Sequence, residues 1–200
     1  MSGSAIRLEQ VRAALAARSP QALPAPAERE AAVVLLLAEI EGDTHVLLIQ
    51  RADRAGDPWS GHMAFPGGHR DADDTDLFLT AARETLEEVG IDLHRDAEAI
   101  GCLDDLHALS ERPIDLLIRP YVCVAAKELT PLANEREVQN TVWVPLSALS
   151  QPEVASSLEV SLNGQSASFP AYVYAGFTIW GLTYRMLTGL MAAVLEPSAP

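Results

Sequence analysis

The residues best suited to chemistry in this sequence are three glutamates that lie within five positions of one another. Glu84, Glu87 and Glu88 stand at i, i+3 and i+4, so a helix would project their carboxylates from one face. Crowded carboxylates repel one another, and a hard divalent cation with oxygen ligands relieves that repulsion. Arg83 lies four residues before Glu87, where it can pair with that carboxylate and hold it in a ligating conformation.

A glutamate run is more often a solvated helix face than a metal site, and Glu-x-x-Glu-Glu alone favours that simpler interpretation. The surrounding pattern favours the metal site instead. The chain passes from a loop with Gly67 and Gly68 through an acidic turn with Asp73, Asp74 and Asp76, and then into Arg-Glu-x-x-Glu-Glu-x-Gly-Ile.

This pattern resembles the Nudix box, the signature of the Nudix hydrolases. The family pattern is Gly, five residues, Glu, seven residues, then Arg-Glu-apolar-x-Glu-Glu-x-Gly-apolar. Residues 83–91 match its second half, with Thr85 at the first apolar position. The first half departs from it, because Gly68 lies fifteen residues before Arg83 instead of fourteen and only aspartates follow. Both departures, and the Phe-Pro-Gly-Gly lead-in, resemble the coenzyme A pyrophosphatase branch, in which an Asp and one extra residue replace the Glu.

Two further segments are similar to that branch. One is a motif that precedes the box, and most of it is matched by Leu47, Leu48 and the run at residues 61–68. The chain departs from this motif in three ways: Ile49 stands in place of a Thr, Gly56 in place of an Arg, and one residue is inserted before Gly61. Residues 179–183 (Ile-Trp-Gly-Leu-Thr) resemble a segment near the C-terminus of such proteins.

The resemblance covers residue 31 to about residue 195. It implies an α/β fold, the Nudix α/β/α sandwich with a mixed β-sheet between helices. The implied reaction is hydrolysis of the diphosphate of a nucleoside derivative, with coenzyme A or its derivatives favoured and 3′,5′-ADP and 4′-phosphopantetheine as products. The implied cofactor is Mg²⁺ or Mn²⁺, bound by the Gly68 carbonyl, Glu84, Glu87 and Glu88, which activates water for in-line attack on phosphorus.

Three alternatives stay open. The substrate could instead be ADP-ribose, a dinucleotide or a (d)NTP. The chain could be a noncatalytic Nudix module that binds nucleotides, although the intact Glu84, Glu87 and Glu88 argue against this. Isomerase chemistry on isopentenyl diphosphate is a third possibility, but its Cys and Glu signature is not recognised in the sequence.

A candidate general base lies beyond the box. Glu137-Val138 precedes a Trp-Val-Pro-Leu run and resembles the family's Glu-Val, whose glutamate approaches the metals or the attacking water in several Nudix enzymes. Glu137 is therefore the first candidate and Glu135 the second. Asp104 and Asp105 either border the pocket or simply form a turn at the end of a strand.

Arg51 and Arg54 are the candidate substrate-binding cations. They follow a predicted strand, and they are either solvated loop residues or the partners that a phosphorylated substrate needs in an acidic protein. The Gly67–Gly68 loop is the other expected substrate contact.

The helix that carries the glutamates must begin at Thr75 or Asp76 as N-cap and end at Gly90. Its expected core face contains apolar and small residues at helical spacing: Phe78, Ala81, Ala82, Thr85 and Val89.

The pattern also predicts the strands that support this helix. Residues 31–38 and 45–50 should form a hairpin around a turn at residues 41–43, in a largely buried sheet. Residues 56–63 read as a loop and 132–137 as a polar loop. Further extended segments are expected at residues 99–106, 114–126 with Pro120 at a bulge or edge, 138–146 and 169–176.

The two ends of the chain are predicted to be helical. Residues 4–18 carry one apolar stripe and precede a proline-rich linker, so we expect residues 1–26 to be a helix and linker beside a single Nudix domain at 27–200. That helix docks on the body or on a second subunit of a homodimer. Residues 178–195 should be a packed core helix, because a membrane span of this length would not contain two glycines and lack a basic flank.

Composition limits the partners. A 200-residue chain can bury a core without staples, and a net charge of −14 argues against binding nucleic acid or anionic membranes. The expected partner is therefore a small nucleotide substrate. Cys102 and Cys123 lie in apolar surroundings and should be reduced core residues, which, with no signal peptide recognised, predicts a cytoplasmic protein.

Overall fold

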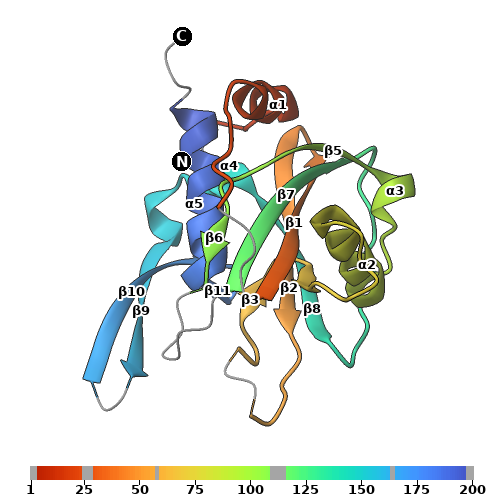
Figure 1. Ribbon diagram of the computed structural model, residues 1–200. Helices are drawn as coiled ribbons and strands as arrows, with labels where there is room; N and C mark the ends of the chain where they lie inside the picture. The colour runs from red at the N-terminus through yellow and green to blue at the C-terminus, as the bar shows by residue number, and fades with distance from the viewer. Residues whose placement is uncertain (1–3, 24–28, 57–58, 109–115, 163–164, 197–200) are drawn as a thin grey trace.

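A computed structural model describes residues 4–23, 29–56, 59–108, 116–162 and 165–196 of the chain (Figure 1). Two predicted boundaries lie outside these ranges: the domain boundary between residues 26 and 27, and the start of a strand at residue 114. Residues 57 and 58 of the predicted loop at 56–63 also lie outside them.

A mixed sheet forms the centre of the molecule and has eight strands within the described residues. Its main path has the order β3-β2-β1-β7-β5; β4 also pairs with β1, β6 with β7 and β8 with β2. β1 and β7 are parallel and the other pairs are antiparallel. The strands are β1 (Arg29–Ile40), β2 (Asp43–Arg51), β3 (Met63–Ala64), β4 (Gly67–His69), β5 (Ala97–Cys102), β6 (Leu106–His107), β7 (Leu116–Ala125) and β8 (Val138–Pro145).

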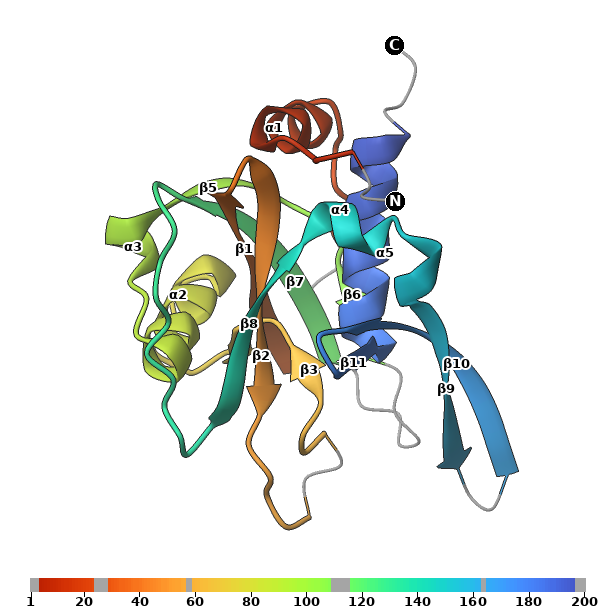
Figure 2. The same ribbon diagram turned by 180° about the vertical axis from the view of Figure 1, so that it is seen from behind.

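Helices cover both faces of this sheet (Figure 2). On one face α2 and α3 enclose a core cluster that includes Ala81, Val89 and Leu93; on the other face α1, α4 and α5 enclose a second cluster. The helices are α1 (Leu8–Ala16), α2 (Leu77–Val89), α3 (Leu93–Asp96), α4 (Leu146–Leu149) and α5 (Gly181–Leu195). The predicted α/β/α sandwich is therefore confirmed.

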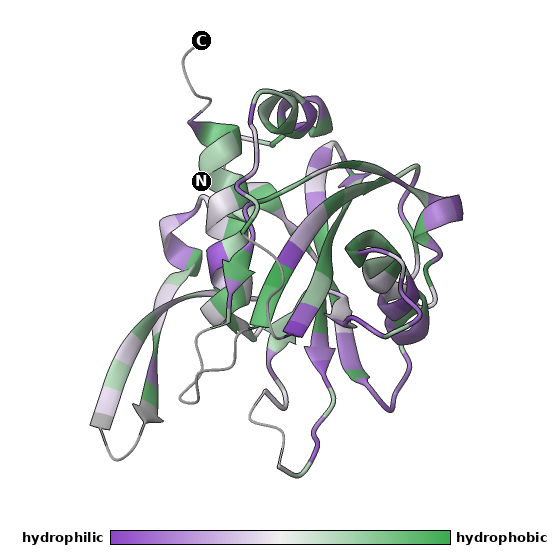
Figure 3. Ribbon diagram, viewed as in Figure 1, coloured by the Kyte–Doolittle hydropathy of each residue, from purple (hydrophilic) through white to green (hydrophobic). Residues whose placement is uncertain are grey.

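β1 shows why the sequence forms this sheet. Its apolar run faces both clusters, because Leu35 and Leu37 pack on the α5 side while Val34 and Leu36 pack on the α2 side. A strand buried on both faces reads as a continuous apolar segment rather than an alternating one. The predicted hairpin with β2 is confirmed, and Figure 3 shows the hydrophobic residues concentrated along these central strands.

The C-terminal helix begins later than predicted. Residues 178–180 belong to β11 (Phe177–Trp180), which pairs with β10 (Gln165–Tyr174) in a second sheet that also contains β9 (Ala155–Leu162). Ala175 and Gly176 both have positive φ, at 50° and 85°, as a tight two-residue hairpin turn requires. The residue types at 178–180 suit a strand and a helix equally, and the turn at residues 175–176 is what makes them a strand.

The strand predicted at residues 99–106 is also interrupted. β5 ends at Cys102, and Leu103 donates its N–H to the carbonyl of Pro120 at 2.9 Å before β6 begins. Pro120 lies inside β7 at this interruption, between the residues of β7 that pair with β5 and those that pair with β6. A proline without an N–H is tolerated where the ladder on that side is broken.

The N-terminal helix α1 is part of the main core. Val11 is fully buried, Ile6 and Leu15 are nearly so, and all three belong to the cluster beneath α5. Arg12 pairs with Glu98 of β5 at 2.7 Å, and the Ile6 N–H bonds Asp43 at 2.8 Å. The helix was predicted to dock on the body of the chain or on a second subunit, and in the structure it packs on the body of its own chain.

Two smaller features concern the cysteines and the length of the helices. Cys102 and Cys123 are both free; Cys123 is a core residue as predicted, whereas Cys102 is half-buried, and burial raises the pKa of Cys123 to about 12. Among the described helices, none is long and apolar enough to cross a membrane.

The position of α1 predicts how much this helix contributes to stability. Leu15→Ala should lower the free energy of unfolding by about 2–5 kcal/mol, because it leaves a cavity in a packed core. Urea denaturation measures this change. Leu195→Ala, at a side chain that is mostly exposed, is the control and should change it by less than about 0.5 kcal/mol. Equal effects of the two substitutions would contradict the assignment of α1 to the core.

Candidate functional site

The loop with Gly67 and Gly68 can lie close to both β1 and helix α2 because neither residue has a side chain. A Cβ on Gly67 would lie 2.2 Å from the Ala32 carbonyl oxygen, since β4 presses against β1 there. A Cβ on Gly68 would lie 2.5 Å from the Glu84 carboxylate. The two glycines thus let one backbone segment contact the sheet on one side and a carboxylate on the other.

Helix α2 presents its glutamates to this loop with the predicted caps. The Asp76 side chain accepts the Leu79 N–H at 2.9 Å, and Gly90 ends the helix in a left-handed conformation. The predicted core face is buried except Phe78, which is half-buried and packs edge-on against Tyr121. The packing of this face fixes the rotation of α2 about its axis, and that rotation directs Glu88 towards the Gly67 N–H of β4.

The three carboxylates occupy different environments. Glu88 is 5% exposed and accepts the Gly67 N–H at 2.9 Å, whereas Glu84 is partly buried and Glu87 is exposed. Burial raises the pKa of Glu88 to about 8; the Gly67 N–H opposes this rise, and the nearby Glu84 carboxylate adds to it. Burial likewise raises the pKa of Glu84, against the effect of Arg83. The chain therefore holds carboxyl groups at a place where their charge is poorly solvated.

Arg83 pairs chiefly with Asp74, and less closely with Glu87 than with either Asp74 or Glu84. Its guanidinium bonds the buried Asp74 carboxylate at 3.0 Å and Glu84 at 3.0 Å, while the predicted contact with Glu87 is longer, at 3.5 Å. It also donates to the His69 carbonyl at 3.0 Å. The Arg83 hydrogen bonds lower the pKa of Asp74 to about 2. Arg83 therefore joins the acidic turn to the helix.

The polar loop at residues 132–137 is fastened to the end of α2. The N–H groups of Leu132 and Asn134 donate to the carbonyls of Val89 and Glu88 at 2.8 and 2.9 Å. These carbonyls belong to the last turn of the helix, where no intrahelical partner exists. The loop brings Glu137 close enough that its charge adds to the rise in pKa of both Glu84 and Glu88.

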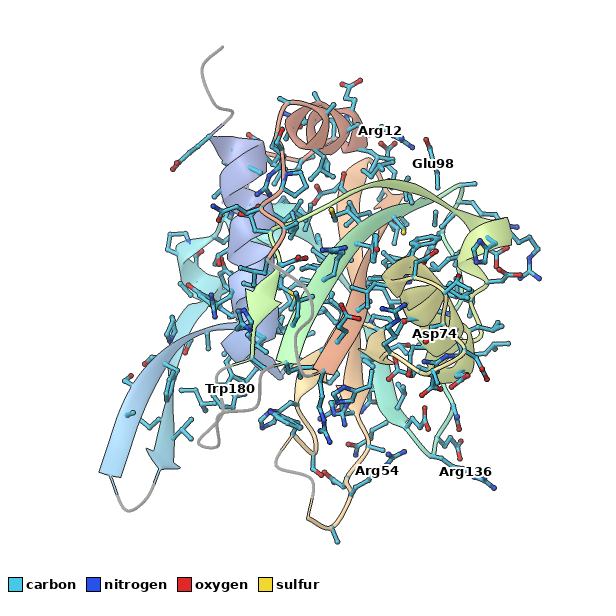
Figure 4. The ribbon with its side chains drawn as sticks, in the orientation of Figure 1. Arg12, Arg54, Asp74, Glu98, Arg136 and Trp180 are labelled. Atoms are coloured by element: carbon cyan, nitrogen blue, oxygen red, sulfur yellow. The ribbon has the colours of Figure 1, made fainter. Side chains whose placement is uncertain are left out.

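The two candidate cations take different positions. The charge of Arg51 partly offsets the rise in the pKa of Glu88, so this guanidinium acts electrostatically on the buried carboxylate. Arg54 instead donates to the Arg136 carbonyl at 3.0 Å and lies 3.5 Å from the Glu137 carboxylate. Figure 4 shows Arg54 and Arg136 at the same end of the molecule. A shallow depression of about 400 Å³ adjoins this loop, lined by Ala52, Asp53, Glu135, Val138 and Gln139.

Asp104 and Asp105 bind the N-terminal segment of the chain. Asp104 accepts from Arg18 and from the Gln21 N–H, both at 2.8 Å. Asp105 accepts two hydrogen bonds from Arg119 and one from the Leu23 N–H. Of the two interpretations of this pair, a structural turn is therefore favoured over a border of the pocket.

Two residues of the site were missed by the sequence interpretation. Asp74 was not distinguished from Asp73 and Asp76, although it stands six positions after Gly68, where the Nudix box has its first glutamate. Arg70 bonds Glu30 at 2.6 Å and the carbonyls of Asp74 and Thr75. No pattern in the sequence marks it, because an arginine in a polar loop is usually solvated.

The donor set fits a hard divalent cation. Carboxylate and carbonyl oxygens are the ligands that Mg²⁺ and Mn²⁺ prefer, and a cation would stabilise the charged form of the buried Glu88. Within the described residues, no three acidic, histidine or cysteine side chains already converge on one point. Glu88 faces the Gly67 N–H and Glu84 faces Arg83, so the glutamates form a partial site that a cation and substrate phosphates would complete.

Comparison with known sequences identifies the family. A profile of the NUDIX domain matches residues 28–162. An uncharacterised Nudix hydrolase, NudL, of Photorhabdus laumondii is 32% identical over 74% of this chain and 76% of its own length. An uncharacterised fission-yeast protein is 39% identical over 64% of this chain, but the match spans only 40% of that protein. The mouse mitochondrial coenzyme A diphosphatase NUDT8 is 28% identical over 84% of this chain and 78% of its own length.

Solved structures agree on the fold. The Nudix hydrolase of Alicyclobacillus acidocaldarius superposes with a TM-score of 0.54 at 18% identity, covering 84% of this chain and 91% of that one. A MutT/Nudix protein of Enterococcus faecalis gives 0.54 at 16% identity, covering 94% and 68%. At these identities the likeness shows the architecture alone.

The Asp74–Arg83 pair predicts how acid affects stability. The folded pKa of Asp74, about 2, lies below its ordinary value of 3.8, so the pair stabilises the protein fully above about pH 4 and loses that contribution as the pH falls towards 2. Asp74→Asn should therefore destabilise the protein at pH 6, and the difference from the wild type should shrink at pH 3. Urea denaturation at both pH values measures this. Asp73→Asn, at an exposed neighbour, is the control and should show no such convergence.

Proposed function

Because this chain belongs to the Nudix hydrolase family, we propose that it hydrolyses the diphosphate bond of coenzyme A or its derivatives with the help of Mg²⁺ or Mn²⁺. Enzymes of this family hydrolyse pyrophosphate bonds in nucleoside diphosphate derivatives. The observation that carries the proposal is the buried Glu88 carboxylate on the Gly67 N–H, with Glu84 packed against Gly68. Coenzyme A is supported by the two mouse coenzyme A diphosphatases, NUDT8 and NUDT7, each 28% identical to this chain.

The residues that would hold the cation are Glu84, Glu87, Glu88 and the Gly68 carbonyl. When bound, a divalent cation supplies positive charge to the diphosphate oxygens and to the attacking water. The chain fixes two of these carboxylates in advance: Gly67 orients Glu88, and the absence of a side chain at Gly68 lets Glu84 approach the loop. Glu87 is exposed and lies 3.5 Å from Arg83.

Glu137 is the proposed general base. It lies on a loop that is bonded to the last turn of α2, so its position relative to Glu84 and Glu88 is set by backbone contacts. Arg54 holds the same loop through the Arg136 carbonyl and lies against the Glu137 carboxylate. Arg54 therefore has two candidate roles, one as a cation for a substrate phosphate and one as a support for the base.

Arg51 is the proposed cation for the substrate. Its charge acts on the Glu88 carboxylate, which the proposed metal site uses, and it stands at the end of β2. The Arg51 N–H bonds the His62 carbonyl at 3.0 Å, and the Gly61 N–H bonds the Arg51 carbonyl at 3.2 Å, so the backbone at the base of the loop that follows is closed. A cytoplasmic location and assembly into a homodimer stay predictions.

The proposed metal site predicts opposite effects on activity and stability for one substitution. Glu88→Gln retains an acceptor for the Gly67 N–H but removes the charge, so kcat should fall by orders of magnitude while the melting temperature stays equal or rises. Mg²⁺ at a hundred times its dissociation constant should stabilise the wild type by about 2.7 kcal/mol and the variant hardly at all. Near-normal turnover by the variant at saturating Mg²⁺ would reject the assignment.

The substrate is tested by removing one phosphate. Coenzyme A carries a 3′-phosphate that an acidic protein must meet with a cation, so dephospho-coenzyme A should be poorer by about ten- to a hundredfold in kcat/KM, as expected for the loss of one charge-assisted hydrogen bond. Arg51→Ala or Arg54→Ala should erase most of this preference. If Arg54 also supports Glu137, Arg54→Ala should in addition lower kcat for both substrates.

These assays need fixed free Mg²⁺, because phosphate groups chelate the ion. Equal turnover of the two substrates by the wild type would reject a cation for the 3′-phosphate. Brisk hydrolysis of ADP-ribose, a dinucleotide or a dNTP, with no turnover of coenzyme A, would replace the proposed substrate and keep the reaction class.

A further inference from the structure

Arg70 joins the start of β1 to the start of α2. It directly follows β4, and its N–H donates to the Glu30 carbonyl at 2.9 Å, which extends the pairing of β4 with β1 by one residue. Its guanidinium bonds the Glu30 carboxylate at 2.6 Å on the same strand. One end of the acidic turn is thereby fixed to the sheet.

The other contacts of Arg70 reach the far end of the same turn. Nε and Nη2 donate to the Asp74 carbonyl at 3.2 and 3.1 Å, and Nη2 donates to the Thr75 carbonyl at 3.2 Å. Thr75 immediately precedes Asp76, the N-cap of α2. The planar guanidinium, with several donors in one fork, suits this bridging role in a way that a lysine ammonium does not.

The consequence for the glutamates passes through Asp74. The backbone of Asp74 is held by Arg70, while its carboxylate holds Arg83. Arg83 also lies 3.0 Å from Glu84 and 3.5 Å from Glu87. If Asp74 moves away, the Arg83 guanidinium loses its principal partner and pairs more fully with these two carboxylates, where it competes more strongly with a cation for the same oxygens.

The core does not depend on this tie. Helix α2 is anchored on the sheet by Ala81, Ala82 and Val89, which lie in the cluster beneath it, whereas the Arg70 side chain is about one-third exposed. Loss of Arg70 therefore loosens the turn at residues 71–76 without removing a buried apolar contact of the helix.

We propose that Arg70 is a positioning residue for the metal site: by tying Glu30 to the turn before α2 it keeps Asp74 on Arg83, and so keeps Glu84 and Glu87 available to a divalent cation. The inference rests on the proposed metal site. It assigns Arg70 no contact with the substrate or the reacting atoms.

Mn²⁺ binding to the enzyme without substrate tests this directly, with electron paramagnetic resonance to measure free Mn²⁺. Substitution of residues that support metal ligands typically weakens affinity by about ten- to a hundredfold, so Arg70→Gln should bind Mn²⁺ at least about tenfold more weakly than the wild type. Arg70→Lys, which keeps the charge on Glu30 but loses the fork, should fall between them. The control is Arg12→Gln, which breaks the 2.7 Å pair with Glu98 on α1 and β5, away from Asp74 (Figure 4), and should bind like the wild type.

Turnover gives a second readout. For Arg70→Gln the Mg²⁺ concentration at half-maximal rate should rise about tenfold, whereas kcat at saturating Mg²⁺ should return close to that of the wild type. A variant that only loses stability would lower the melting temperature without this shift. If Arg70→Gln does not fold, Arg70→Lys decides the question by the same two measurements.

The outcomes separate the two proposals. Wild-type Mn²⁺ affinity in Arg70→Gln, or an equal loss in Arg12→Gln, overturns the role of Arg70 and leaves the metal site standing. A wild type that binds no Mn²⁺ and gains no activity from Mg²⁺ overturns the proposed function, and this inference with it.

Discussion

The burial of a carboxylate against a glycine loop is the constraint on which the rest of this structure depends. Glu88 lies almost out of solvent with the Gly67 N–H as its hydrogen-bond donor, and its pKa is raised accordingly. A buried ionisable group of this kind costs stability unless its charge is met. This cost falls where the glycine loop, helix α2 and the loop at residues 132–137 meet, which is the physical reason to regard the place as a site and not as part of the core.

The sheet and the helices serve this convergence. β4 pairs with the first part of β1 and β2 with its last part, so the two glycines belong to the sheet, and Gly68 lies close to the Glu84 carboxylate of α2. The apolar face of α2 packs on the sheet and fixes the rotation of the helix about its axis, and that one contact orients all three glutamates. The loop at residues 132–137 then caps the helix end and carries Glu137 to the same place. Arg83 lies 3.0 Å from Glu84, and the charge of Arg51 acts on Glu88.

Much of this was predictable because it depends on local pattern. The spacing of the glutamates, the aspartate before α2, the glycine after it and the apolar run of β1 are each read within a few residues, and each was found as expected. The misplaced start of α5 shows where local pattern fails: residues 178–180 (Thr-Ile-Trp) suit strand or helix alike, and pairing with β10 decides between them. Asp104 and Asp105 show the same limit, since the N-terminal residues that they bind, Arg18, Gln21 and Leu23, lie more than eighty positions away in the chain.

The sequence by itself determined the family, the architecture and the identity of the acidic helix, because a signature of fixed spacing on one helix survives without any long-range contact. Only the tertiary structure decided which aspartate holds Arg83, that Arg54 lies on the Glu137 loop, and that Arg70 ties the sheet to the helix start. It also showed that α1 packs into the core cluster beneath α5, because an apolar stripe indicates that a helix has a buried face but not which element covers that face. These are contacts between segments distant in sequence, and their geometry is set by packing, which residue types and spacing alone do not encode.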